Sequence, residues 1–107
     1  MSDKDKSFNA AEESQVKDRK RKDERLRDIE LADIKKIMSS REGRRFVWRL
    51  LDRAGVFRTS FTGNSTTFFN EGMRNMGLMV IGDVMAACAD QYVVMMNESK
   101  EDERTNG

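Results

Sequence analysis

Three residue types are absent or rare in this sequence, and each absence narrows what the protein can be. The 107 residues include no proline, no histidine and one cysteine, Cys88. Without proline, and with eight methionines and many lysines, glutamates and arginines, the chain favours helices over a β-sandwich or barrel. The lack of histidine removes the commonest general base and metal ligand. A single cysteine excludes an internal disulfide and a thiolate metal site, and it suits a reducing cytosol.

The sequence also lacks the patterns of a membrane protein or an enzyme. No apolar run reaches the ~18 residues that a membrane span needs, and the N-terminus has no apolar core of a signal peptide. No carboxylate pair, no serine or cysteine beside a base and no cluster of metal ligands is apparent. We therefore expect no membrane contact, no catalytic activity, no cofactor and no metal.

Charge is unevenly distributed, although the formal net charge is +1. Residues 17–27 and residues 41–74 each hold seven basic and three acidic groups, whereas residues 75–107 hold two basic and six acidic groups. The first two thirds of the chain are thus compatible with contact to an anionic surface, which is weak evidence of function.

The N-terminal third is polar. Residues 1–15 have an isolated Phe8 and no period, which predicts a flexible arm. Residues 16–38 alternate in charge over three- and four-residue steps, and this pattern predicts a charged helix. Its apolar stripe begins at Leu26, so we expect the first part to be solvated and the second part to dock. A dimeric coiled coil is the alternative, although few heptads are present.

A second helix is predicted over residues 41–54, where Ser39 and Glu42 match a capping box. Gly55 follows the helix at the place of a left-handed C-cap, and Val56 or Phe57 can fold back over the last turn. The connection from residue 57 to residue 67 is rich in turn residues and carries two aromatics that look buried, Phe57 and Phe61.

A third helix is predicted over residues 67–89, with Ser65 or Thr66 as its cap. Apolar residues recur there at three- and four-residue steps. Asp90 is placed to cap a short last helix, residues 91–99.

Three glycines five residues apart interrupt this third helix, at Gly72, Gly77 and Gly82. A glycine in a helix interior costs roughly 1 kcal/mol against alanine, so each needs a reason. A phosphate-binding loop requires glycines between a strand and a helix, which is not the case here. We therefore interpret the glycines as sites of close packing by residues of the second helix or its loop.

Glu71, Arg74 and Asn75 lie beside these glycines. Glu71 and Arg74 are three residues apart and can form a surface salt bridge. Alternatively, Arg74 reaches carbonyl groups of the 57–65 loop and holds that loop in place, because its planar guanidinium suits several acceptors. Neither interpretation involves catalysis.

Two further patterns each have two interpretations. The basic run consists of Arg19, Lys20, Arg21 and Lys22. It is either a solvated helix face or a nucleic-acid contact, with Arg41, Arg44 and Arg45 as accessory contacts. Six methionines follow in the second half of the chain, Met73, Met76, Met79, Met85, Met95 and Met96. They either fill the core or line an adaptable partner surface.

Residues 43–98 resemble a known family in three stretches, "GRRFVWRLLDRAGVFRTSF", "TTFFNEGMRNMGLMV" and "ADQYVVMMNE". The family is a small domain encoded among the head and DNA-packaging genes of many tailed bacteriophages, typified by a Bordetella phage protein. The matching positions are Gly55, Val56, Phe57, Phe61, Phe68, Glu71, Gly72, Arg74, Asn75, Gly77, Tyr92 and Glu98. The chain departs from the family pattern at Ala54, often cysteine, and at Met73, often arginine, and the latter puts in doubt a role for paired arginines.

Together these patterns predict an all-α protein of three main helices and a short C-terminal helix. The expected parts are a flexible arm (1–15), a charged helix (16–38), a helical domain (39–98) and an acidic disordered tail (99–107). The resemblance implies a structural or head-assembly protein of the virion, near the portal or internal core, present in the host cytoplasm during assembly. It implies head, core or portal proteins as partners; self-association is a further expectation, and nucleic acid is the alternative partner.

Overall fold

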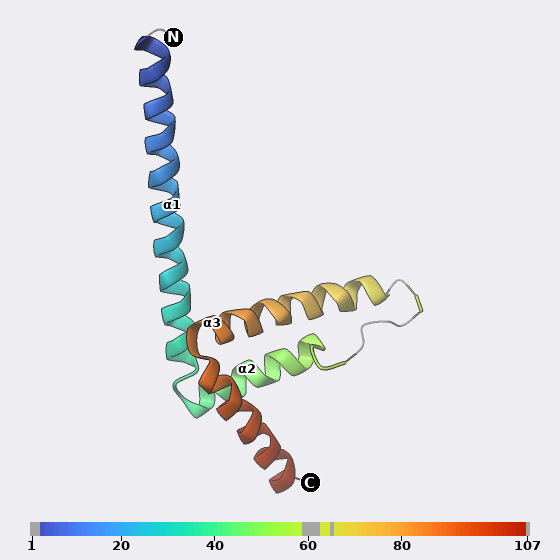
Figure 1. Ribbon diagram of the computed structural model, residues 1–107. Helices are drawn as coiled ribbons and strands as arrows, with labels where there is room; N and C mark the ends of the chain where they lie inside the picture. Colours follow the sequence, from blue (N-terminus) through green and yellow to red (C-terminus); the bar gives the residue numbers. More distant parts are fainter. Residues whose placement is uncertain (1–2, 59–62, 65, 107) are drawn as a thin grey trace. The chain divides into compact units, whose positions relative to one another are not determined.

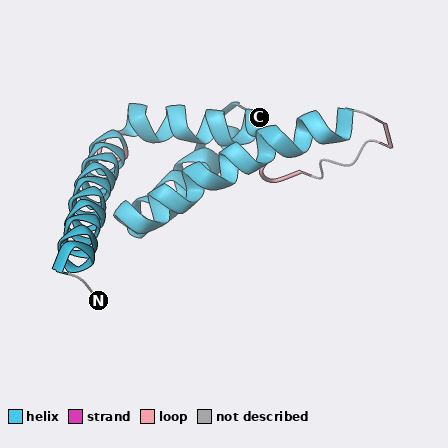
Figure 2. Ribbon diagram, turned by 90° about the horizontal axis from the view of Figure 1, so that it is seen from above, coloured by secondary structure: helices cyan, strands magenta, loops and turns pink. Residues whose placement is uncertain are grey.

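A computed structural model describes residues 3–58, 63–64 and 66–106 (Figure 1). Three helices follow one another, α1 (Asp3–Ile37), α2 (Arg41–Ala54) and α3 (Thr66–Asn106). The described residues contain no strand, so the all-α prediction is confirmed (Figure 2). By its internal contacts the chain divides into two units, Met1–Glu30 and Leu31–Gly107.

The unit Met1–Glu30 consists of the larger part of α1. Every side chain described between residues 9 and 30 is exposed, including those of Leu26 and Ile29. The helix begins at Asp3, whereas the sequence predicted a flexible arm up to residue 15. Charge pairs such as the one between Arg27 and Glu30, 3.2 Å apart, support a helix without tertiary packing. Of the apolar stripe predicted to dock, Leu26 and Ile29 are exposed, and partial burial begins at Leu31.

In the unit Leu31–Gly107, α1 ends in a tight turn whose side chains enter the core. Met38 is fully buried, and the N-cap of α2 is Ser40, whose hydroxyl accepts a hydrogen bond of 3.0 Å from the N–H of Gly43. The predicted cap, Ser39, instead donates to the carbonyl of Lys36. A Cβ on residue 43 would overlap the carbonyl oxygen of Ile37, so the third helical residue must be Gly43. The cap, three residues earlier, is therefore Ser40 and not Ser39.

The C-terminal end of α2 agrees with its prediction. Gly55 has φ 77° and ψ 26°, and its N–H donates to carbonyl groups of the last turn. This is the left-handed C-cap for which glycine is the preferred residue. The next residue, Val56, is buried and donates its N–H to Leu51, which closes the helix end.

The third helix is longer than predicted. α3 continues to Asn106 as two helical segments joined by a kink at Cys88, where φ is −163° and ψ is 68° (Figure 1). The predicted break near residue 90 corresponds to this kink, but the segment after it continues α3 and is not a separate short helix of residues 91–99 among the described residues. The predicted disordered tail is helical up to Asn106. At the start of α3 the side chain of Asn64 accepts a hydrogen bond from the N–H of Thr66, while Ser65 lies outside the described residues.

The core lies where α2 packs on α3. Gly77 lies near the C-terminal end of α2, and Glu98 lies near its N-terminal end, so the two helices cross with opposite directions (Figure 1). The buried apolar residues are Met38, Val47, Leu51, Val56, Val84, Cys88 and Met95. A core of this size is small for an independent domain, and such units gain stability from assembly.

One described helix is apolar and long enough to cross a membrane by length and composition alone. It is Thr66–Thr105, with a mean hydropathy of 1.5 over 18 residues, so the expectation that no such run exists was wrong. The same helix supplies Val84, Cys88 and Met95 to the core, and 17% of its apolar 18-residue window is buried.

Candidate interaction surfaces

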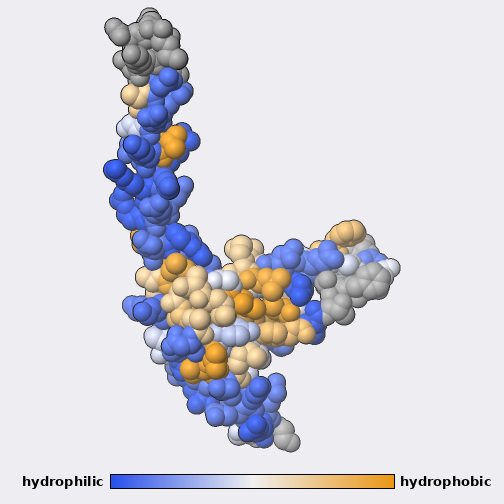
Figure 3. Space-filling model, viewed as in Figure 1, coloured by the Kyte–Doolittle hydropathy of each residue, from blue (hydrophilic) through white to orange (hydrophobic). Residues whose placement is uncertain are grey.

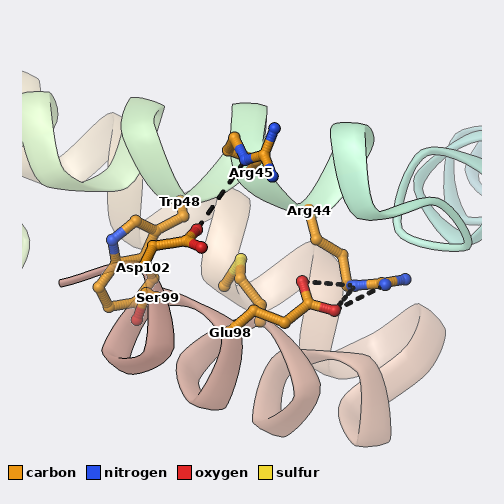
Figure 4. A pocket seen from close by; sticks show the side chains of 7 residues that line it. Arg44, Arg45, Trp48, Glu98, Ser99 and Asp102 are labelled. Atoms are coloured by element: carbon orange, nitrogen blue, oxygen red, sulfur yellow. Dashed lines mark hydrogen bonds and ion pairs between the residues drawn. The ribbon is translucent and has the colours of Figure 1, made fainter. Parts of the chain in front are cut away.

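An ion pair between Arg44 of α2 and Glu98 of α3 joins the two helices (Figure 4). Arg44 Nη2 lies 2.8 Å from Glu98 Oε1, and Nε donates to both carboxylate oxygens at 3.1 Å. The two side chains are 13% and 18% exposed. Arg44 Nη1 also donates to the carbonyl of Met38 at 2.9 Å. One arginine thus ties the turn before α2 to the last part of α3 by charge-assisted hydrogen bonds.

This pair shifts the pKa of both partners. The hydrogen bond from Arg44 lowers the pKa of Glu98 below its ordinary value, although burial opposes the shift. The hydrogen bond to Glu98 likewise raises the pKa of Arg44. Removing one partner of a buried pair generally costs about 3–5 kcal/mol, and this pair keeps some solvent contact, so the lower end applies.

A second, exposed set of ion pairs lies next to it. Asp102 accepts a hydrogen bond from Arg41 at 3.3 Å and lies 3.9 Å from the Nε of Arg45. Exposed pairs of this kind contribute less than about 1 kcal/mol each. They nevertheless hold the acidic end of α3 against α2. Arg41, Arg44 and Arg45, predicted as accessory nucleic-acid contacts, are therefore engaged within the chain.

The basic run of α1 is accessible. The side chains of Arg19, Lys20, Arg21 and Lys22 are all exposed in the unit Met1–Glu30. Acidic residues are interspersed along the same helix, at Asp18 and Asp23 among others. The geometry is therefore that of a solvated face that is open to an anionic partner.

The three glycines of α3 differ in their surroundings. A Cβ at Gly77 would lie 2.6 Å from Cγ2 of Val56 and 3.0 Å from Cβ of Ala54, so Gly77 admits the end of α2. Nothing lies within 4 Å of a Cβ built at Gly72 or Gly82. The close-packing interpretation therefore applies to Gly77 and is wrong for Gly72 and Gly82.

The polar residues beside the glycines do not form the predicted contacts within the described part of the chain. No ion pair joins Glu71 and Arg74, and Glu71 and Asn75 are exposed. The Nε of Arg74 is buried without a described hydrogen-bond partner. The alternative, in which Arg74 holds the 57–65 loop, involves residues 59–62 and 65, which lie outside the described residues.

The aromatic residues after α2 are more exposed than the sequence suggested. Phe57 stacks on Trp48 with ring centroids 5.1 Å apart, so it folds back over α2, yet about half of it remains exposed. Phe61 lies outside the described residues. Phe57 and Gly55 thus close the C-terminal end of α2.

An apolar groove runs between α2 and α3. Leu50, Arg53 and Ala54 line it on α2, and Met73 and Met76 line it on α3. Phe46 and Phe69 extend the same surface by one turn, since each lies four residues before a groove residue. We call this surface the groove face; its apolar members are Phe46, Leu50, Phe69, Met73 and Met76. Figure 3 shows hydrophobic residues gathered over α2 and α3.

The methionines divide between the two interpretations. Met38 and Met95 are buried in the core, whereas Met76 and Met85 are 61% and 50% exposed. Met76 and Met85 are nine residues apart, which places them on opposite sides of α3. Leu78, also exposed, is seven residues before Met85 and shares its side, which we call the opposite flank.

Three of the residues that hold the unit together had little signal in the sequence. Gly43 is one of seven glycines, and only the observed turn shows that it must lack a side chain. Arg44 and Glu98 are 54 residues apart, and Glu98 was marked only by the family resemblance. Helical periodicity places such residues on a face but does not pair them across the fold.

Comparison with known proteins identifies the family. The family model of the Bbp19-like phage proteins matches residues 34–97, which is more than half of the chain. A search of curated proteins and a search of solved structures each found no match. The matched range covers the end of α1, all of α2 and α3 up to the residue before Glu98. The chain belongs to the Bbp19-like phage protein family.

Proposed function

We propose that this Bbp19-like phage protein is a structural or head-assembly component that works by protein–protein contact and not by catalysis. Its place is in the particle, near the portal or internal core, or on the head during assembly in the host cytoplasm. Family membership supports the phage setting. The resemblance to a small domain encoded among head and DNA-packaging genes supports the role.

The observation that carries the proposal is the amount of apolar side chain left in solvent. The groove face and the opposite flank together expose residues from both sides of α3. Soluble monomers rarely expose contiguous apolar patches of more than a few hundred Å², and larger patches mark interaction sites. A helical unit with a small core and two apolar flanks is suited to being held between neighbours in an assembly.

Phage complementation tests this function. A phage that lacks the gene should be rescued by the wild-type chain and poorly rescued by a double variant of the opposite flank, Leu78→Glu with Met85→Glu. Val16→Glu is the control, because Val16 is also an exposed apolar residue, at 63%, but lies in the unit Met1–Glu30. Normal particle yield without the gene, or equal rescue by all three chains, would refute the proposal.

The second candidate function is nucleic-acid binding through the basic run. The exposure of Arg19, Lys20, Arg21 and Lys22 favours it. Phosphate contacts make affinity fall steeply with salt, whereas an apolar protein contact does not weaken in this way. A steep salt dependence of DNA binding by the full chain would therefore support this candidate.

A further inference from the structure

We propose that the groove face is the contact between two copies of this chain, joined about a two-fold axis. The inference rests on the proposed function, since it names the first partner in an assembly, and it leaves the opposite flank for other phage proteins. Three features of the groove face support a second copy: its area, its spacing along α3 and its polar edge.

The exposed apolar area matches what a stable dimer needs. The five apolar members of the groove face are, on average, about half exposed. Large side chains present roughly 200 Å² each when fully exposed, so the groove face offers roughly 500 Å². A standard interface buries about 800 Å² per partner, of which about 450–520 Å² is apolar. The groove face therefore supplies the apolar part of one complete interface.

The spacing of the groove face along α3 is self-complementary. Phe69, Met73 and Met76 of the groove face are followed by Val80, which is partly buried against the core; the four residues lie at steps of four, three and four, so the order of steps is the same in both directions. Two antiparallel copies of α3 then place Phe69 opposite Val80 and Met73 opposite Met76. Each large aromatic thus meets a small β-branched residue, the arrangement that fills an interface without voids.

The α2 helix completes this arrangement. In this register the two-fold axis passes between Arg74 and Asn75, and α2 ends beside Gly77, so α2 of each copy flanks its own half of the α3 pair. Leu50 and Phe46 of α2 then extend the apolar contact beside α3. Arg53, at the edge of the groove, lies in the rim, where interfaces are normally polar. The dimer would also enlarge the small core of each copy.

The first test is the mass of the full chain in solution, measured by sedimentation equilibrium at micromolar concentration. The wild-type chain should have twice the mass of 12.4 kDa. Met76→Glu places a charge at the centre of the interface and should raise the dissociation constant by about 100-fold or more. Met85→Glu is the matched control, because it introduces the same change at a similarly exposed methionine on the other side of α3.

The masses of the wild-type chain and the two variants show which surface, if any, joins two copies. A monomeric wild-type chain would overturn the inference, and so would a dimer that survives both Met76→Glu and Met85→Glu, which would indicate pairing through another surface, such as α1. A dimer lost in Met85→Glu but kept in Met76→Glu would place the contact on the opposite flank. None of these outcomes depends on phage particles, so they are distinct from a failure of the proposed function in complementation.

A second measurement keeps the test valid if Met76→Glu unfolds. Met73→Cys and Met76→Cys are prepared separately, and Cys88 stays in place because it is buried. After oxidation, a mixture of the two variants should yield several times more cross-linked dimer than either variant alone, since Met73 faces Met76 of the second copy. Equal yields from the mixture and from the single variants would contradict the proposed register.

Discussion

Adding one methyl group at Gly77 should destabilise the helical unit, although alanine is the better helix former. The new Cβ would lie 2.6 Å from Cγ2 of Val56 and 3.0 Å from Cβ of Ala54. Neither neighbour yields easily, because Val56 is buried just after the left-handed turn and the Cβ of Ala54 is attached directly to the backbone of α2. Overpacking of this kind costs about 1–3 kcal/mol, against about 1 kcal/mol gained in helix propensity. The net loss should be about 0–2 kcal/mol.

Gly72 and Gly82 provide the matched controls, because nothing lies within 4 Å of a Cβ at either position. Gly72→Ala and Gly82→Ala should stabilise the chain by up to about 1 kcal/mol each. Since the propensity gain is common to all three variants, the difference between Gly77→Ala and the controls gives the packing cost, about 1–3 kcal/mol. Urea unfolding followed by circular dichroism measures it. Equal stabilisation in all three variants would refute the described packing of α2 on α3.

Three further predictions concern ionisable groups. Glu98→Gln should lower the free energy of unfolding by about 3 kcal/mol at neutral pH, because Arg44 stays buried without its partner. Because the folded-state pKa of Glu98 is lowered, its contribution to the free energy of unfolding is present above pH 4.5 and should be lost as the pH falls through that lower pKa. In an acid titration, the free energies of unfolding of wild type and variant should therefore converge. Burial raises the pKa of the Cys88 thiol, so a disulfide reagent should label it at least about 100-fold more slowly in the folded chain than in urea, and equal rates would contradict its burial. Changing residues 20–22 to glutamine should leave the melting temperature and phage yield nearly unchanged; loss of tight DNA binding together with phage yield would favour the nucleic-acid candidate.

Local signals in the sequence predicted the parts of the fold that depend on local interactions. The bounds of α2 and its C-cap at Gly55 agree with the prediction, because helix ends are set by residues within one turn of each other. The N-cap was displaced by one residue, since the choice between Ser39 and Ser40 depends on the close approach of Gly43 to the end of α1. That approach is a contact between two elements, and no local pattern encodes it.

Contacts between distant residues account for the rest. The end of α3 was predicted to be disordered from its acidic composition, but Asp102 and Glu98 meet arginines of α2 that lie more than 50 residues earlier. Similarly, equal spacing suggested one role for three glycines, whereas only Gly77 faces α2. Helical periodicity shows which residues share a face, and the second element decides which face is covered.

The measurement that tests the central claim most directly is quantitative mass spectrometry of purified phage particles and of head-assembly intermediates. As a contact protein of the phage, this chain should copurify with particles or intermediates at a constant ratio to the head or portal proteins. That ratio should persist after a high-salt wash, because the proposed contacts are largely apolar. Absence of the chain from both particles and intermediates, or its complete removal by salt, would contradict the account.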